Sequence, residues 1–279
     1  MNNIIVAKDL TYGYERDTVV LKDINLKINK GEMIALTGKN GSGKTTLSKH
    51  FNGLLKPTKG TILVDGIDTR EETVDRIALK VGYVFQNPDH QIFNDTVYKE
   101  AAFGPENQGL EGEELRKRVV HALEAVGLLE YENIYPYSLS KGQRQRLSIA
   151  SVIAMNSEAI VLDEPTTGLD HRESLEIMEL LKELNSEGIT IIFITHDMNL
   201  VAKYGQRMIV LSQGEIIADD SPRNIFKMKK VIERAHLRVP LITELAQELE
   251  MFRDAPLDPQ EFFQGLCEMR RDYANVLTS

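Results

Sequence analysis

The chain has 279 residues and a formal net charge of −9, a size that fits one large core with a small appendage and argues against a second full-sized domain. An acidic chain lacks the clustered lysines and arginines that neutralise nucleic-acid phosphates, so we expect no nucleic-acid partner. Because no apolar run is long enough to cross a bilayer and the first residues lack a signal-peptide pattern, we expect a cytosolic protein that reaches a membrane only through a partner.

Short apolar segments at the start of the chain predict β-strands. The expected strands are residues 4–7, 19–21, 24–28 and 33–36. Tyr12 and Tyr14 fall in the loop that we expect before the second strand, where an aromatic ring could stack on a base. A tyrosine in such a place is also a common surface or core residue, so the pattern by itself leaves both interpretations open.

A glycine-rich loop, residues 38–46, follows the last of these strands and leads into the start of a helix. Its sequence GKNGSGKTT has the spacing of a P-loop, in which backbone N–H groups and a helix N-terminus hold phosphates. Lys44 is then placed to bridge the outer phosphates, and the Thr45 hydroxyl to ligate Mg²⁺. A glycine turn without a ligand is the alternative, which the complete spacing after a strand disfavours. The residues expected to hold the nucleotide are Gly38, Asn40, Gly41, Ser42, Gly43, Lys44, Thr45 and Thr46.

Gln86 follows the strand that we expect over residues 81–85, and Asn87-Pro88-Asp89 then breaks the chain. Sheets of α/β proteins bind their ligands at the carboxyl ends of the strands, so Gln86 is a candidate site residue. From about residue 90 to 157 the apolar residues have helical spacing. This stretch therefore predicts a helical subdomain inserted between two strands.

The segment Leu139-Ser140-Lys141-Gly142-Gln143 precedes an amphipathic helix expected over residues 144–154. Ser140 is a good N-cap for this helix. A helix N-terminus with a small hydroxyl and a glycine is also an anion site. The two interpretations are compatible, and these five residues alone do not separate them.

Two expected buried strands end in candidate catalytic or metal-binding side chains. The apolar run that begins at Ala159 ends in Asp163 and Glu164, which we expect beside the P-loop. There Asp163 could hold a Mg²⁺-bound water, and Glu164 could accept a proton from an attacking water. The run 189–195 ends at His196, whose neutral ring could donate a hydrogen bond to a γ-phosphate and still orient water.

The last part of the chain changes from strands to helices. Residues 207–211 and 214–218 predict a hairpin that closes the sheet. Beyond residue 220, a Ser-Pro helix start and amphipathic stretches at 241–249 and 259–273 predict helices. We therefore expect a small helical extension over 221–279, below the size of an independent domain.

With these elements placed, residues 1–220 resemble the ATP-binding subunit of an ATP-binding cassette (ABC) transporter. The matching motifs are, in order, Walker A with Lys44, the Q-loop with Gln86, the signature at 139–143, Walker B with Asp163 and Glu164, the D-loop at 167–170 and the switch histidine His196. The resemblance implies an α/β P-loop NTPase core of the RecA type, with an N-terminal antiparallel β subdomain, a helical subdomain and the small C-terminal helical extension.

The resemblance also implies an ATPase that uses ATP and Mg²⁺ as a dimer. Each ATP would lie between the P-loop of one subunit and the signature of the other, with Glu164, His196 and Gln86 as catalytic residues. Thr45, Gln86 and Asp163 would hold the metal, and Tyr14, rather than Tyr12, would stack on adenine. The residues implied to reach the partner's nucleotide are Ser140, Gly142, Gln143 and Asp170.

Residues 85–91 and 102–107 resemble the energy-coupling factor subfamily, the CbiO type, whose ATPases serve uptake of vitamins or of cobalt and nickel ions. This implies as partners a second ATPase subunit, identical or related, a transmembrane coupling protein and a substrate-binding membrane subunit, at the cytoplasmic face of the membrane. The alternatives are the ATPase of another ABC importer class, a soluble ABC protein that acts on DNA or the ribosome, and a P-loop kinase or GTPase. No long insert or basic surface supports the soluble ABC protein, and neither a kinase nor a GTPase needs residues 139–143; a GTPase would also need a base-reading Asn-Lys-x-Asp stretch, which the sequence lacks.

Two of the motifs depart from the family pattern. Lys141 stands where the signature usually has glycine, and the D-loop reads Thr167-Gly168 where Ser-Ala is common. Ser140, Gly142 and Gln143 are retained, so we expect a working signature. Because Lys141 changes the signature and bears on its hydrolytic strength, pairing with a second, related ATPase stays an alternative to pairing with an identical copy.

Overall fold

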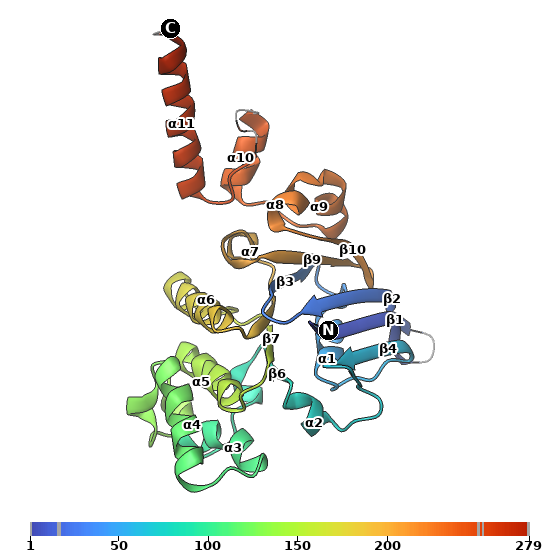
Figure 1. Ribbon diagram of the computed structural model, residues 1–279, viewed down its shortest axis with the longest axis vertical. Coiled ribbons are helices and arrows are strands. Elements are labelled where there is room, and N and C mark those ends of the chain that lie inside the picture. Colours follow the sequence, from blue (N-terminus) through green and yellow to red (C-terminus); the bar gives the residue numbers. More distant parts are fainter. Residues whose placement is uncertain (1, 16–17, 250–251, 253, 278–279) are drawn as a thin grey trace.

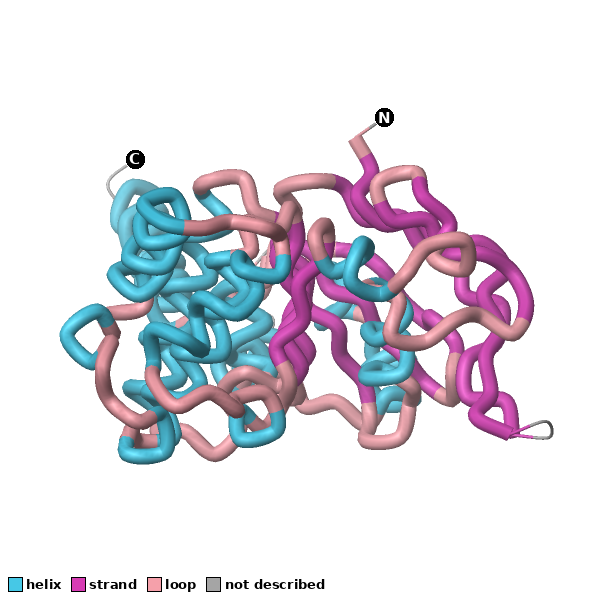
Figure 2. Tube along the Cα trace, turned by 90° about the horizontal axis from the view of Figure 1, so that it is seen from below, coloured by secondary structure: helices cyan, strands magenta, loops and turns pink. Residues whose placement is uncertain are grey.

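Two β-sheets lie side by side in the molecule, with helices packed around them (Figure 1). This computed structural model describes residues 2–15, 18–249, 252 and 254–277. Residues 1 and 279, the outer bounds of the two predicted domains, lie outside the described residues. Figure 2 shows the division of the molecule, with helices gathered on one side and most strands on the other.

The larger sheet has six strands in the order β10-β9-β3-β8-β7-β6, and the neighbouring strands from β9 to β6 pair in parallel. Only β10 is antiparallel, in the hairpin with β9 that the sequence predicted. Every residue of the four strands at its centre and far edge, β3, β8, β7 and β6, is buried, because both faces are covered. The strands are β3 (Met33–Gly38), β6 (Val81–Val84), β7 (Ala159–Asp163), β8 (Thr190–Ile194), β9 (Arg207–Ser212) and β10 (Glu215–Asp220).

The smaller sheet is antiparallel, in the order β2-β1-β4-β5, and corrects the prediction for the first strands. Its strands are β1 (Asn3–Glu15), β2 (Thr18–Asn29), β4 (Lys59–Val64) and β5 (Ile67–Asp68). The predicted strands 4–7, 19–21 and 24–28 are parts of the long β1 and β2, whereas the predicted strand 33–36 lies in β3. Tyr12 and Tyr14 therefore lie in β1 and not in a loop. The reason is that the left-handed residues Asp9 (φ 50°) and Asp23 (φ 48°) shift the register and interrupt the period-two pattern.

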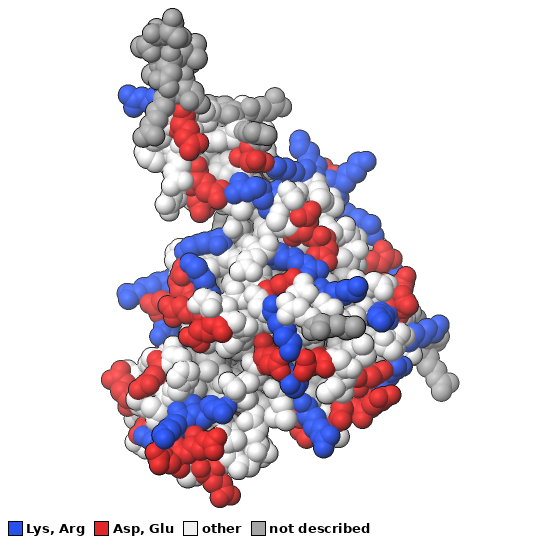
Figure 3. All heavy atoms as spheres, in the orientation of Figure 1, with Lys and Arg blue, Asp and Glu red and all other residues white. Residues whose placement is uncertain are grey.

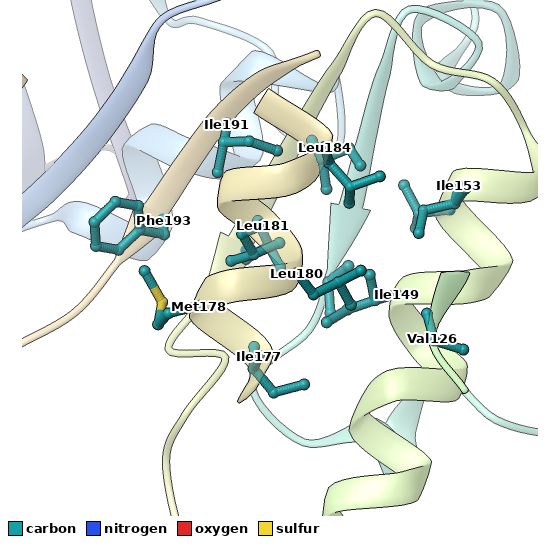
Figure 4. Close-up of a cluster of buried hydrophobic side chains, with 14 of the residues drawn as sticks. Val126, Ile149, Ile153, Ile177, Met178, Leu180, Leu181, Leu184, Ile191 and Phe193 are labelled. Carbon is teal, nitrogen blue, oxygen red and sulfur yellow. The ribbon is translucent and has the colours of Figure 1, made fainter. Parts of the chain in front are cut away.

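The two faces of the larger sheet bury different sets of side chains. One face packs with α1 (Lys44–Phe51) and the smaller sheet, and the other with α6 (His171–Ser186), α7 (Met198–Tyr204) and the helical insert. Figure 4 shows part of the second cluster, in which Phe193 of β8 lies near Met178 of α6, and Leu180 lies toward Ile149 of α5. Alternate residues of each strand thus fix the sheet between its two layers.

The predicted helical stretch within 90–157 is confirmed. Its helices pack on one another through buried residues such as Ala101, Val119 and Ile149. The helices are α3 (Val97–Asn107), α4 (Gly112–Ala125) and α5 (Lys141–Ala154), with short 3₁₀ turns at Pro88–His90, Leu129–Tyr131 and Pro136–Ser138; a short helix, α2 (Val74–Ala78), precedes β6.

The predicted helices of the last part are present too, and α10 and α11 extend away from the sheets (Figure 1). The four helices are α8 (Pro222–Lys227), α9 (Lys229–Ala235), α10 (Leu241–Leu249) and α11 (Pro259–Leu277). Arg223 of α8 donates to both carboxylate oxygens of Glu261 at 2.9 and 2.8 Å, which holds α11 to α8. On the face seen in Figure 3, acidic and basic side chains are interspersed, so their charges compensate locally. Within the described residues, no helix has both the length and the apolar character needed to span a bilayer.

Four charged side chains join the smaller sheet to the larger one. Lys30 follows β2, Asp65 follows β4, Lys80 precedes β6 and Glu158 precedes β7. Each lysine pairs with both carboxylates, at 3.0 Å to Asp65 and at 2.5 and 2.6 Å to Glu158. Hydrogen bonds from Lys30 and then Lys80 lower the pKa of Asp65 and of Glu158.

We expect Glu158→Gln to lower the free energy of unfolding by about 1 kcal/mol near neutral pH, since these groups are about one-third exposed and solvent screens their attraction. A carboxylate whose pKa is lower in the folded protein stabilises it above its unfolded pKa, and this stabilisation is lost as the pH falls through the folded pKa. Denaturant unfolding at several pH values should therefore show the two proteins converging in acid. Glu113→Gln, in an exposed helix pair with Lys117, is the control and should change little. A difference between Glu158→Gln and wild type that is the same at every pH would contradict the assignment.

Candidate nucleotide-binding and catalytic site

The predicted P-loop connects β3 to α1 at the carboxyl end of β3. Gly38, Gly41 and Gly43 have φ values of 140°, 78° and 105°, which side chains rarely allow. A Cβ on Gly38 would lie 2.2 Å from the Leu211 carbonyl oxygen, whereas nothing lies within 4 Å of a Cβ on Gly41. The loop is therefore tightly packed at its base and open at its tip, beside the N-terminus of α1.

Lys44 is buried inside this loop. Its Nζ donates to the carbonyl oxygens of Gly38 at 2.8 Å and Lys39 at 3.0 Å. Burial lowers the pKa of Lys44, and the negative charges of Glu164 and Asp163 oppose this effect. An ammonium group that is largely removed from water and surrounded by carbonyl oxygens is well placed to pair with a phosphate.

Asp163 meets the P-loop at the end of β7. Its two carboxylate oxygens accept hydrogen bonds from the Thr45 hydroxyl at 3.2 Å and the Tyr83 hydroxyl at 3.3 Å. The Tyr83 hydroxyl also lies 3.0 Å from the Ser48 hydroxyl. Burial raises the pKa of Asp163, and the bonds from Thr45 and Tyr83 act against this rise. An attached cation would relieve the cost of this buried negative charge.

The donor set fits ATP and Mg²⁺. The Ser42 hydroxyl in the P-loop is buried, and its oxygen has no hydrogen-bond partner among the described residues. A buried hydroxyl without a partner is costly, so its place in the loop indicates a ligand oxygen as the missing partner. The hydroxyl of Thr45 and the carboxylate of Asp163 are the hard oxygen donors that Mg²⁺ prefers.

Glu164, the residue after Asp163, lies close to three polar side chains. One of its oxygens, Oε2, accepts from Gln86 Nε2 at 2.8 Å and from the Thr167 hydroxyl at 2.9 Å. The other, Oε1, lies 3.7 Å from His196 Nδ1. Glu164 has a left-handed backbone with φ 49°, a conformation that costs energy for a residue with a side chain and is common at functional sites. The structure thus joins Gln86, Glu164 and His196, which lie at three strand ends.

Tyr14 lies at the end of β1, close to the first turn of α1. Its hydroxyl is 3.1 Å from the Thr46 hydroxyl, and the residue is 59% exposed. Tyr12 packs edge-on against Tyr14 and against the buried His50, with ring centroids 5.1 and 4.7 Å apart. Tyr14 thus keeps a free face next to the P-loop, whereas Tyr12 supports it from behind.

The predicted signature lies at the start of α5, where its side chains cap the helix. The Ser140 hydroxyl accepts from the Gln143 backbone N–H at 3.2 Å, and the Gln143 side chain accepts from the Ser140 N–H at 2.9 Å. Asp170 similarly caps α6, accepting from the Glu173 N–H at 2.8 Å. In the described part of the chain, no hydrogen bond connects Ser140, Gly142, Gln143 or Asp170 to residues 38–46.

Sequence reasoning gave no role to Tyr83 or to the Thr167 hydroxyl, although both touch the acid pair. A signal for Tyr83 existed, because it is the one hydroxyl-bearing residue in the apolar segment 81–85, and a buried tyrosine hydroxyl requires a polar partner. For Thr167 the sequence gave its place in a turn but not the direction of its side chain.

This arrangement of P-loop, acid pair and signature agrees with the comparison to known proteins. A family model described as ABC transporter matches residues 21–167. The chain belongs to the ABC transporter family. Its larger sheet with helices, the antiparallel sheet and the helical insert are the ABC ATPase fold that solved relatives share.

Two curated relatives of this ABC protein differ in the share of their own length that this chain matches. The energy-coupling factor transporter ATP-binding protein EcfA of Methanocaldococcus jannaschii is 45% identical over 98% of this chain and 98% of its own length. A putative ABC transporter ATP-binding protein of Caldanaerobacter subterraneus subsp. tengcongensis is 50% identical over 88% of this chain. The chain spans only 43% of the length of that second protein.

Two solved ABC structures are similar along most of this chain. CbiO1 of Clostridium perfringens, part of the ABC transporter complex cbiONQ, has a TM-score of 0.77 and 39% identity, over 90% of this chain and all of that chain. A dimeric ATP-binding cassette in a post-hydrolysis state with ADP and Pi has a TM-score of 0.70 and 34% identity, over 78% of this chain and 99% of that chain.

Proposed function

We propose that this ABC ATPase is the ATP-hydrolysing subunit of an energy-coupling factor transporter. The observation that carries the proposal is the joined arrangement at the ends of β6, β7 and β8, where Asp163 meets Thr45 of the P-loop and Glu164 meets Gln86 and His196. The subfamily rests on the similarity to EcfA over nearly the whole chain and to CbiO1.

Some of the site residues bind ATP and Mg²⁺, and others take part in proton transfer. The P-loop and Lys44 bind the phosphates, and Thr45, Asp163 and Gln86 are the proposed Mg²⁺ ligands, the metal when bound supplying charge neutralisation at the outer phosphates. Glu164 accepts the proton of the attacking water, and its bonds to Gln86 and Thr167 hold the acceptor oxygen in one place. His196 donates to the γ-phosphate, and Tyr14 stacks on the adenine ring.

A second ATPase subunit completes the site. Ser140, Gly142, Gln143 and Asp170 lie apart from this chain's own P-loop, and the start of α5 is a helix N-terminus suited to an anion. We infer that they contact the nucleotide of the partner subunit, identical or related. The domain division at about residue 220 and a peripheral place at the membrane, through a transmembrane coupling protein and a substrate-binding subunit, are parts of the same proposal.

Co-purification tests the subfamily. When the chain is expressed with the membrane proteins of its own organism, we expect it to be recovered with a transmembrane coupling protein and a small substrate-binding membrane subunit. Recovery with two ordinary permease subunits and a separate soluble or lipid-anchored binding protein would assign it to another importer class. Recovery with ribosomes or DNA would reject the transport function itself.

A further inference from the structure

Lys141, the residue at the usual glycine position of the signature, reaches out of α5 to the loop that follows the Walker B acids. Its Nζ donates to the Thr167 carbonyl oxygen at 3.0 Å. It also passes so close to Gly168 that a Cβ there would lie 2.2 Å from Nζ. Gly168 has φ 75°, so this position is suited to glycine both by backbone conformation and by the approach of the lysine.

The residue that Lys141 holds is bonded to Glu164 in two ways. The Thr167 hydroxyl donates to the Glu164 carboxylate at 2.9 Å, and the Thr167 backbone N–H donates to the Glu164 carbonyl oxygen at 3.1 Å. A continuous path of hydrogen bonds therefore runs from the first residue of α5 to the carboxylate proposed as the proton acceptor. Among the described residues, this is the hydrogen bond that joins loop 164–169 to the helical insert.

Loop 164–169 depends on this hydrogen bond because residues near both of its ends have a left-handed backbone, which is strained at Glu164 and freely adopted at Gly168. Glu164 is left-handed, and Gly168 has the freedom of a residue without a side chain. A glycine at position 141 would remove the hydrogen bond to the Thr167 carbonyl oxygen. The loop that carries Thr167 would then hold the Glu164 carboxylate without this bond to α5.

We propose that Lys141 is a positioning residue for hydrolysis, which holds Thr167 so that its hydroxyl fixes the Glu164 carboxylate. The proposal rests on the proposed function, since it assigns a support to that catalytic group. Lys141 also lies between Ser140 and Gly142, the residues proposed to contact the partner's nucleotide. The bond thus connects one nucleotide site, through the start of α5, to the proton acceptor of the other.

The test separates kcat from KM. We expect Lys141→Met, which keeps the aliphatic stem and removes the donor, to lower kcat about fivefold and to leave KM for ATP within about twofold, because one hydrogen bond to a catalytic loop is lost and no phosphate contact is. Lys141→Arg should restore most of the rate, since a guanidinium can donate to the same carbonyl. Lys117→Met, an exposed lysine of α4, is the matched control and should not change either constant.

A double-mutant cycle decides whether the effect passes through Thr167. In a Thr167→Val background, the carbonyl remains and the hydroxyl bonded to Glu164 is gone, so adding Lys141→Met should lower kcat by less than about twofold. Fully additive losses, an unchanged kcat in Lys141→Met, or a raised KM with normal kcat would overturn the proposal; the last would make Lys141 a phosphate ligand. Wild-type turnover and its loss in Glu164→Gln, measured in parallel, report on the proposed function independently of Lys141.

Discussion

Replacing Glu164 with glutamine is expected to lower the steady-state rate of ATP hydrolysis by about 10²–10⁴-fold, the range that a general base contributes. Glutamine is almost the same size as glutamate and can still accept from Gln86 or Thr167, so the loop should keep its shape. Its amide oxygen cannot take a proton from water near neutral pH. The P-loop is unchanged, and ATP should therefore still bind with nearly wild-type affinity.

The measurement pairs steady-state hydrolysis of ATP with binding of a fluorescent ATP analogue. Glu187→Gln, at the exposed end of α6, is the control and should hydrolyse ATP like wild type. Because ATP stays uncleaved in Glu164→Gln, we also expect the ATP-bound dimer to persist longer in size-exclusion chromatography. Normal turnover in this variant would reject Glu164 as the proton acceptor, and loss of ATP binding would mean that the substitution disturbs the P-loop.

The sequence was sufficient for the parts of the site that lie at strand ends. An apolar run that ends in Asp163 and Glu164 is a buried strand, and parallel strands end at one edge of a sheet, so these acids had to lie near the P-loop. Hydrogen bonds between a side chain and the backbone of the same helix turn were equally predictable, as the N-cap role of Ser140 shows.

Contacts that depend on where a side chain points could not be predicted. Nothing local to Lys141 shows that its ammonium group reaches Thr167, which is 26 residues away and on another element. The bond between Tyr83 and Asp163 likewise depends on the register of β6 against β7. The long strand β1 was missed for a different reason, because the left-handed Asp9 breaks the alternation by which strands are recognised.

Replacing Ser140 with arginine is expected to leave ATP binding to the single subunit within about threefold of wild type and to weaken ATP-driven dimer formation by more than about tenfold, since a bulky charged group at the contact adds a clash and desolvation. The reason is the position of Ser140, which caps α5 and, in the described part of the structure, has no hydrogen bond to the P-loop of its own chain. Nucleotide binding by the monomer and ATP-dependent dimerisation are then separate measurements, the second made in the Glu164→Gln background so that hydrolysis does not interfere.

Two controls separate the blocked contact from a weakened helix. Ser140→Ala removes the cap and should cost about 1 kcal/mol of stability while adding no bulk, so its dimer should form much better than that of Ser140→Arg. Ser140→Asn retains a capping side chain and should fold like wild type. If Ser140→Arg and Ser140→Ala weaken the dimer equally, the lost cap is the cause; if Ser140→Arg weakens ATP binding by the monomer, the start of α5 serves the nucleotide of its own subunit. A dimer defect confined to the arginine variant would place the partner's nucleotide at Ser140, because only a group that approaches this helix end from another subunit meets the added side chain.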